Sequence, residues 1–262
     1  MHSCLIFGFG RSGTSMLGGI LAQSGYYTGE NSYAPRSSNP LGFFEDARIN
    51  GINELILEPY DYPGEIPEAM APGKSYSPYR PRYGHRWLSF MAPCTPVACT
   101  DPEIIGEIRS LVTISKPFAY KDPRFSYTLS AWKAHLGEHV KYICIFREPS
   151  RVIQSVITEC STADYLSAFS ITEALAYTLW HNCYLHILEA IRPMIGKQLI
   201  FISYDHFLLG EQVDELSRFL DVNIQVSHVD RNLNRSVPGP VPAAEIGDLY
   251  RTLLTLSKVL TA

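Results

Sequence analysis

The residues with the clearest potential for chemistry stand near the start of the chain, in the octet GFGRSGTS at residues 8–15. Gly8, Gly10 and Gly13 match the G-x-G-x-x-G pattern of dinucleotide-binding folds. The octet also matches G-x-x-x-x-G-K-[ST], except that Thr14 replaces the lysine. A glycine loop before a helix presents backbone N–H groups and the helix N-terminus to an anion. The octet therefore predicts a phosphate-binding site, with a plain strand-to-helix turn as the alternative.

Neither familiar pattern is completed elsewhere in the chain. A dinucleotide site requires a buried strand that ends in an acidic residue about twenty positions after the loop. Glu30 stands at that distance, but the preceding residues 24–29, SGYYTG, are not apolar. A triphosphatase site requires the loop lysine and a magnesium-binding aspartate after another buried strand. The candidate strand at 140–146 is followed by Arg147, which favours an anionic ligand neutralised by protein cations.

The elements that must position these residues are visible as apolar runs. Four short runs predict buried parallel strands, at residues 4–7, 117–120, 140–146 and 198–203. Each run precedes a helical pattern, and further helices are expected at about 172–192 and at the C-terminal end. Alternating strands and helices predict an α/β fold with a central parallel sheet flanked by helices. We expect residues 1–262 to form one domain with an irregular Pro- and Tyr-rich insert at about 59–100, either an ordered lid or acceptor-binding wall or a loose insertion.

Composition limits the partners of the protein. The formal net charge is −4, so no global basic field attracts nucleic acid or an anionic membrane. No apolar run reaches about 18 residues and no signal-peptide pattern is present, so we expect a cytoplasmic protein. The six cysteines include no C-x-x-C pair. They are expected to be reduced structural thiols, with a Cys94–Cys99 disulfide as the alternative.

Four segments occur together in an order that is typical of one enzyme family. They are GRSGTS at 10–15, NPLGFFED at 39–46, KDPR at 121–124 and REPSRVIQS at 147–155. Together they resemble the signature of sulfotransferases, above all the bacterial, tyrosylprotein-sulfotransferase-like and carbohydrate branches. The resemblance is loose in the C-terminal third of the chain. It implies a P-loop-like three-layer fold, 3′-phosphoadenosine 5′-phosphosulfate (PAPS) as co-substrate, and no metal.

The resemblance assigns the binding of PAPS, the sulfuryl donor, to two parts of the chain. The loop would cradle the 5′-phosphosulfate with backbone and hydroxyl donors from Arg11, Ser12, Gly13, Thr14 and Ser15. Arg147 and Ser155 match the R-x(7)-S of the family's 3′-phosphate site. Tyr204 and Arg235 correspond to residues that lie near the nucleotide in relatives, and Arg151 either assists Ser155 or is solvated.

The resemblance also indicates how charge is supplied during transfer. Arg11 would provide the positive charge of the absent loop lysine, three positions earlier. Lys121 matches the KDP lysine that contacts the moving sulfate in the tyrosylprotein branch. Positioned cations of this kind stabilise the charge that develops on the leaving nucleotide. Asp122 and Arg124 are expected to order the turn after Lys121 through an ion pair.

A general base should deprotonate the acceptor at the moment of transfer. Glu30, in a Gly-Glu context similar to that of the tyrosylprotein and heparan branches, is the first candidate. Glu45 is the rival, although it would also suit the start of a helix. His85 and His135 are further alternatives, because some cytosolic sulfotransferases use a histidine.

The expected activity is therefore metal-independent transfer of a sulfuryl group to a hydroxyl or amine of a small-molecule, carbohydrate or peptide acceptor. Two alternatives remain at this stage. One is a kinase-like phosphotransferase that uses Mg-ATP, and the other is a nucleotide-binding protein without catalysis. The net charge of −4 does not favour a strongly acidic polymer as acceptor.

Overall fold

The computed structural model describes residues 1–36, 39–65, 75–224, 239 and 243–259. Its centre is a four-stranded parallel sheet in the order β2-β1-β3-β4. The strands are β1 (Cys4–Phe7), β2 (Ala119–Lys121), β3 (Lys141–Phe146) and β4 (Leu199–Ser203). In register, Cys4 of β1 lies opposite Ala119 on one side and Lys141 on the other. The four predicted strands are confirmed, although β2 starts two residues later and ends one residue later than predicted, so that it contains Lys121.

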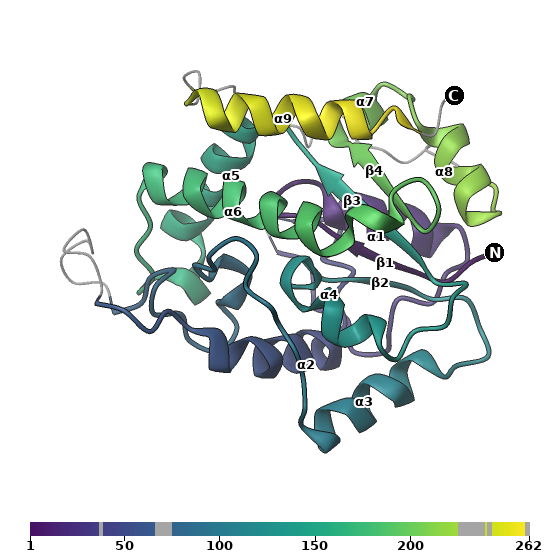
Figure 1. Ribbon diagram of the computed structural model, residues 1–262, viewed down its shortest axis with the longest axis horizontal. Helices are drawn as coiled ribbons and strands as arrows, with labels where there is room; N and C mark the ends of the chain where they lie inside the picture. Colours follow the sequence, from purple (N-terminus) through teal and green to yellow (C-terminus); the bar gives the residue numbers. More distant parts are fainter. Residues whose placement is uncertain (37–38, 66–74, 225–238, 240–242, 260–262) are drawn as a thin grey trace.

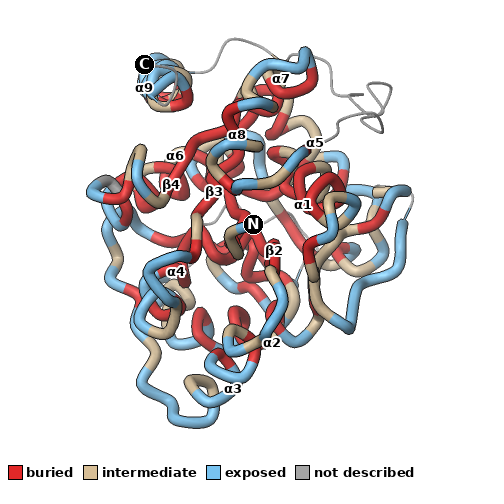
Figure 2. The backbone as a smooth tube through the Cα atoms, turned by 90° about the vertical axis from the view of Figure 1, so that its right-hand side faces the viewer, coloured by how far each residue is buried: buried red, intermediate tan, exposed pale blue. Residues whose placement is uncertain are grey.

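The sheet is the middle of three layers, because alternate strand residues face two different hydrophobic clusters. One cluster takes Leu5, Phe7 and Phe146 from the sheet, and the other takes Ile6 and Ile145. Helices contribute to the first cluster from α2 (Ala47–Leu57), α3 (Pro102–Val112), α4 (Phe125–Lys133), α5 (Pro149–Thr162), α6 (Glu173–Ile191) and α9 (Ala244–Leu256). The second cluster is completed by α1 (Thr14–Gln23), α7 (Tyr204–Leu208) and α8 (Val213–Leu220). Figure 1 shows α9 along the top and α2 and α3 along the bottom, and Figure 2 shows that buried positions concentrate on the strands and the helix faces toward them.

Local chemistry explains where helices begin and end. Helix α2, which the periodicity did not single out, begins after Asp46, whose carboxylate accepts from the backbone N–H groups of Arg48 and Ile49. An aspartate in this position satisfies amide donors that the first helical turn leaves without partners. The pattern after β4 is divided into α7 and α8, because Gly210 (φ 90°) and Gln212 (φ 64°) adopt left-handed backbone conformations. Short 3₁₀ turns lie at Glu58–Tyr60, Arg86–Leu88, Asp164–Leu166 and Arg192–Met194.

All six cysteines carry free thiols, so the alternative Cys94–Cys99 disulfide is not formed. The helix predicted at about 172–192 is confirmed as α6, and the predicted C-terminal helix is confirmed as α9. The one-domain organisation and the boundaries of the 59–100 insert stay predictions.

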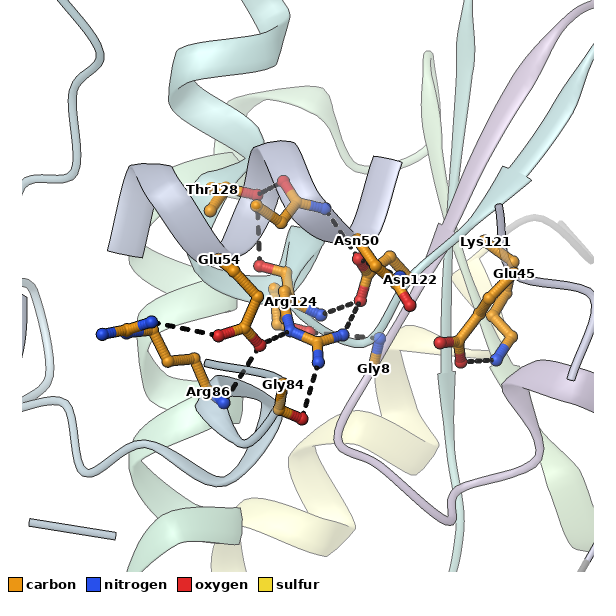
Figure 3. A network of polar contacts seen from close by, with 12 residues as sticks. Gly8, Glu45, Asn50, Glu54, Gly84, Arg86, Lys121, Asp122, Arg124 and Thr128 are labelled. Carbon is orange, nitrogen blue, oxygen red and sulfur yellow. Dashed lines mark hydrogen bonds and ion pairs between the residues drawn. The ribbon is translucent and has the colours of Figure 1, made fainter. Parts of the chain in front are cut away.

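A buried polar network fastens α2 to the turn after β2 (Figure 3). The fully buried Asp122 carboxylate accepts from Asn50 (2.6 Å) and Asn53 (2.9 Å) of α2 and pairs with the Arg124 guanidinium at 3.0 Å. The expected Asp122–Arg124 ion pair is thus confirmed. Arg124 also pairs with Glu54 of α2. Burial opposes the charge of Arg124, yet Asp122 and Glu54 raise its pKa above the ordinary value.

The same network reaches the segment that contains Trp87. Glu54 accepts from the Arg86 backbone N–H at 3.1 Å and pairs with its guanidinium at 3.2 Å. Arg86 pairs further with Asp61 at 2.9 Å, and Arg124 donates to the Gly84 carbonyl at 3.2 Å. Residues 84–87 are therefore held against α2 and the end of β2 by charged hydrogen bonds.

We predict that replacing the buried partner costs far more stability than replacing the exposed one. Glu54 is 1% exposed and faces two arginines, whereas the side chain of Glu58, 3.5 Å from Arg86, is 63% exposed. Glu54→Gln should lower the free energy of unfolding by about 3 kcal/mol or more, since it removes the buried carboxylate that Arg86 and Arg124 share. The matched control Glu58→Gln should cost less than about 1 kcal/mol. Urea unfolding measures both, and equal losses would contradict the assigned role of Glu54.

Candidate active site

The loop residues after three parallel strands meet at one edge of the sheet. Gly8 follows β1, Asp122 follows β2 and Arg147 follows β3. The chain passes from β1 to β2 on one side and then to β3 on the other side of β1. Open α/β sheets bind ligands at the carboxyl ends of their strands where the strand order reverses in this way. The glycine loop Gly8–Ser15 therefore lies at the favoured ligand-binding position of the fold.

The glycine loop runs between two aromatic rings that leave no room for side chains. A methyl group at Gly10 would overlap the Trp87 ring, and one at Gly13 would overlap the Tyr204 ring. Gly13 has φ 98° and is the N-cap of α1, a conformation that strongly favours glycine. The two glycines thus allow Trp87 and Tyr204 to pack directly against the loop backbone.

The buried side chain of Tyr184 in α6 makes hydrogen bonds to the glycine loop. Its hydroxyl accepts from the Phe9 backbone N–H at 3.3 Å, donates to the Ile145 carbonyl at 3.0 Å and lies 3.2 Å from Ser12 Oγ. Burial raises the pKa of Tyr184 well above its ordinary value, so the hydroxyl stays protonated. The fully buried Ser12 therefore turns its hydroxyl toward Tyr184, and its contribution to an anion would come from the backbone.

A cavity of about 210 Å³ opens beside the loop. Its polar wall comes from the loop, from the end of β2 and from residues 33–50, and its apolar wall is largely aromatic. The lining residues are Gly10, Arg11, Thr14, Ser15, Tyr33, Arg36, Phe43, Glu45, Asn50, Gly84, Trp87, Lys121, Pro123, Arg124 and Tyr165. Four of these side chains are cationic and one is acidic, so the described wall favours anions although the chain has net charge −4.

An ion pair between Lys121 and Glu45 lies in this cavity (Figure 3). Lys121 ends β2 and is 2% exposed. Glu45 lies in the extended segment before α2, where its carbonyl accepts from the Tyr33 backbone N–H at 3.3 Å. A burial this deep leaves the ammonium dependent on the carboxylate for compensation. The site thus holds a cation and a potential base in contact, next to the glycine loop.

Arg11 turns from the loop toward α5. Its Nε donates to Ser155 Oγ at 3.0 Å, and its guanidinium lies 3.6 Å from the buried carboxylate of Glu159. The backbone of Arg11 has φ 70°, a left-handed conformation that is uncommon for arginine. The structure therefore brings Arg11 and Ser155, two of the residues predicted to bind PAPS, into direct contact.

Arg147 and Tyr204 lie together beyond the loop. The Arg147 guanidinium stands 4.7 Å from the centre of the Tyr204 ring, a cation–π distance. Burial lowers the pKa of Arg147 from its ordinary value, which still leaves the group charged near neutrality. Glu148 caps α5 by accepting from the backbone N–H groups of Ser150 and Arg151. Arg235 lies outside the described residues.

The candidate bases occupy different surroundings. Glu45 lines the cavity, whereas Glu30 is exposed, is absent from the cavity wall and contacts Asp46 through its backbone N–H at 2.9 Å. His85 is buried with Nε2 against the Tyr165 carbonyl at 2.9 Å, and burial lowers its pKa. His135 follows α4, toward the opposite edge of the sheet. Of the four, Glu45 is the one among the lining residues.

Comparisons with known proteins agree with this arrangement. The profile described as Sulfotransferase family matches residues 4–225. The chain belongs to the sulfotransferase family. A comparison with curated proteins gave no match.

Solved structures support the fold of this sulfotransferase. The sulfotransferase domain from the curacin biosynthetic pathway has a TM-score of 0.55 and 14% identity, with 97% of each chain covered. The sulfotransferase domain from the Synechococcus PCC 7002 olefin synthase has a TM-score of 0.52 and 17% identity, covering 96% of this chain and 94% of that one. At these identities the likeness establishes the three-layer fold.

Several residues of the sulfotransferase site were not found from the sequence. Tyr184 of α6 and Glu159 of α5 belong to no recognised motif and reach the loop from far along the chain. Arg36 stands in a loop segment, also outside the recognised motifs. Trp87 had a weak signal, since it belongs to the aromatic residues of the 59–100 insert. The packing of the Trp87 and Tyr204 rings against Gly10 and Gly13 became visible only in the structure.

Among the described residues, no helix is long and apolar enough to cross a membrane. No group of three or more His, Cys, Asp or Glu side chains in the same part of the chain could hold a metal ion.

Proposed function

We propose that this sulfotransferase moves a sulfuryl group from PAPS to a hydroxyl or amine acceptor and releases 3′,5′-ADP. The observation that carries the proposal is the Lys121–Glu45 ion pair in a cavity lined by the glycine loop. The pair supports the proposal because it brings a cation that could stabilise negative charge into contact with a candidate base, in the cavity beside the glycine loop. Family membership supports the reaction class.

The proposed donor site has two parts on either side of Arg11. The 5′-phosphosulfate would bind at the N-terminus of α1, where backbone N–H groups of Thr14 and Ser15 begin the helix. The 3′-phosphate would bind near Arg147 and Ser155, the residues that the sequence assigned to it. Because Arg11 donates to Ser155 Oγ at 3.0 Å, its guanidinium lies between the two parts.

The proposed reaction is an in-line displacement at sulfur. The acceptor oxygen or nitrogen forms a bond to sulfur while the bond from sulfur to the bridging oxygen of the 5′-phosphate breaks. The acceptor's proton passes to the Glu45 carboxylate, and the electron pair of the broken bond stays on the phosphate. Lys121 and the α1 N-terminus would stabilise this developing charge, an effect of a few kcal/mol per donor.

Glu45 is preferred to Glu30 as the base because Glu45 lines the cavity and contacts Lys121. If the Lys121 ammonium moved from Glu45 to the sulfate of the bound donor, the Glu45 carboxylate would be free to accept a proton. Glu30 stays a candidate from the sequence, with its side chain exposed.

The rival functions predict different ligands. A kinase-like phosphotransferase would use Mg-ATP, yet Thr14 occupies the place of the loop lysine and the cationic Arg147 follows β3. A non-catalytic nucleotide-binding protein would have no need of the Lys121–Glu45 pair. The proposed acceptor remains a small molecule, a carbohydrate or a peptide. Six free thiols accord with the proposed cytoplasmic location.

We predict that 3′,5′-ADP binds without metal. Isothermal titration in the presence of a chelator should detect 3′,5′-ADP binding at least about tenfold tighter than 5′-AMP, because Arg147 and Ser155 are assigned to the 3′-phosphate. ATP with magnesium should bind no more tightly than 5′-AMP. Tight Mg-ATP binding together with absent 3′,5′-ADP binding would refute the sulfotransferase activity and favour the phosphotransferase.

We further predict that Glu45→Gln and Glu30→Gln differ in turnover. Loss of a general base typically lowers rates by about 10²–10⁴-fold, so Glu45→Gln should lose sulfuryl transfer to that extent while its 3′,5′-ADP affinity changes less than about threefold. Glu30→Gln should retain transfer within about threefold. Release of 3′,5′-ADP from PAPS, with a panel of phenols, sugars and tyrosyl peptides as acceptors, measures both variants.

The reverse outcome, with Glu30→Gln inactive and Glu45→Gln active, would assign the base to Glu30. Because Glu45→Gln removes the partner of the buried Lys121, thermal unfolding of each variant provides the control for misfolding.

A further inference from the structure

Three of the four cations that line the cavity are neutralised inside the protein. Arg11 faces Glu159 at 3.6 Å, Lys121 pairs with Glu45, and Arg124 pairs with both Asp122 and Glu54. Their charges are therefore balanced before any ligand enters. The fourth cation, Arg36, is in a different situation.

Arg36 has aromatic partners in place of acidic ones. Its guanidinium carbon lies 4.9 Å from the centre of the Tyr165 ring and 5.9 Å from that of Phe43. Among the described residues no carboxylate lies within 4.0 Å of it. Its backbone is fixed by reciprocal hydrogen bonds with Asn39 at 2.8 and 3.3 Å. Arg36 is thus an anchored, exposed cation at the cavity wall.

Contacts of this kind with aromatic rings leave the N–H edge of a guanidinium available for an anion. A guanidinium stacks on aromatic rings through its flat face, while its N–H donors point outward in the plane. Those donors match a carboxylate, sulfate or phosphate in bidentate geometry. An anion beside Arg36 would supply the charge that the described part of the chain does not.

The wall around Arg36 indicates the body that carries this anion. Four aromatic side chains line the cavity, namely Tyr33, Phe43, Trp87 and Tyr165. Aromatic walls of this kind hold flat apolar groups by stacking and edge contacts. The Lys121–Glu45 pair belongs to the same cavity, so a single ligand bounded by these residues would meet rings, the pair and Arg36.

We infer that the acceptor is an anionic hydroxyl compound, a flat apolar body with a carboxylate, sulfate or phosphate that pairs with Arg36 while its hydroxyl faces Glu45. This inference rests on the proposed function, because it assigns the hydroxyl to the transfer centre. Arg36 is then a specificity-determining residue for the acceptor, distinct from the loop residues that bind the donor. Selection comes from the single cation, since the other three are already paired.

The test compares two ring acceptors that differ only in charge. The probes are 4-hydroxyphenylacetate and its neutral analogue 4-hydroxyphenylacetamide, titrated calorimetrically into wild type, Arg36→Gln and Arg109→Gln, each saturated with 3′,5′-ADP. Arg109 is an exposed arginine of α3 outside the cavity wall and controls for net charge. Affinity for 3′,5′-ADP is measured in parallel for each protein.

We expect the carboxylate to bind wild type and Arg109→Gln at least about tenfold more tightly than the amide, the size of one charge-assisted contact. Arg36→Gln should abolish that difference and leave 3′,5′-ADP affinity unchanged. Equal affinities in wild type, a difference that survives in Arg36→Gln, or no binding of either probe would overturn the inference. A loss of 3′,5′-ADP affinity in Arg36→Gln would assign Arg36 to the donor instead.

Because acceptor discrimination is read from binding, its failure is distinguishable from failure of sulfuryl transfer. Absence of 3′,5′-ADP binding to wild type would refute the proposed function. In that case titration of the two probes into the nucleotide-free protein still reports whether Arg36 selects an anion.

Discussion

The buried contacts of Asp122, Arg124 and Glu54 are the constraint on which the site depends. Charges this deeply buried are stable only when every partner is present, so the network fixes three segments at once: the end of β2, helix α2 and residues 84–87. Lys121 immediately precedes Asp122, and Trp87 immediately follows Arg86. The network therefore sets the positions of Lys121 and of the Trp87 ring that covers Gly10. Neither Asp122 nor Glu54 itself lines the cavity.

The cations near the glycine loop are also paired with acidic residues inside the protein. An anion-binding site needs cations that can reach the ligand, but a buried cation destabilises the protein unless a counter-charge is present before the ligand binds. Arg11 meets this need through Ser155 and Glu159, and Lys121 through Glu45. A ligand anion would exchange one partner for another, so each of these two cations has a counter-charge both before and after the anion binds. Under the proposed function, Arg11 and Lys121 would supply the positive charge that the loop lysine provides in the G-x-x-x-x-G-K-[ST] pattern.

Features that depend on residues close together in the chain were predictable from the sequence. Apolar runs predicted the four strands, and adjacency in the chain was sufficient to predict the Asp122–Arg124 pair and the position of Arg147 after β3. Contacts between distant segments were not predictable in this way. Glu45 meets Lys121 across 76 positions, and the polar side chains of α2, Asn50, Asn53 and Glu54, form a stripe at helical spacing that is normally typical of a solvated face. Only the fold reveals that this stripe is buried, with Asn50 and Asn53 against Asp122 and Glu54 against two arginines.

The most direct test of the central claim is a crystal structure of the protein with 3′,5′-ADP bound. In that structure the 5′-phosphate should lie at the N-terminus of α1, within hydrogen-bond distance of the Thr14 and Ser15 backbone N–H groups. Lys121 and Glu45 should face its open side, and the 3′-phosphate should contact Arg147 and Ser155. A nucleotide bound away from the glycine loop, or a 5′-phosphate faced by Glu30 in place of Glu45, would contradict the central claim.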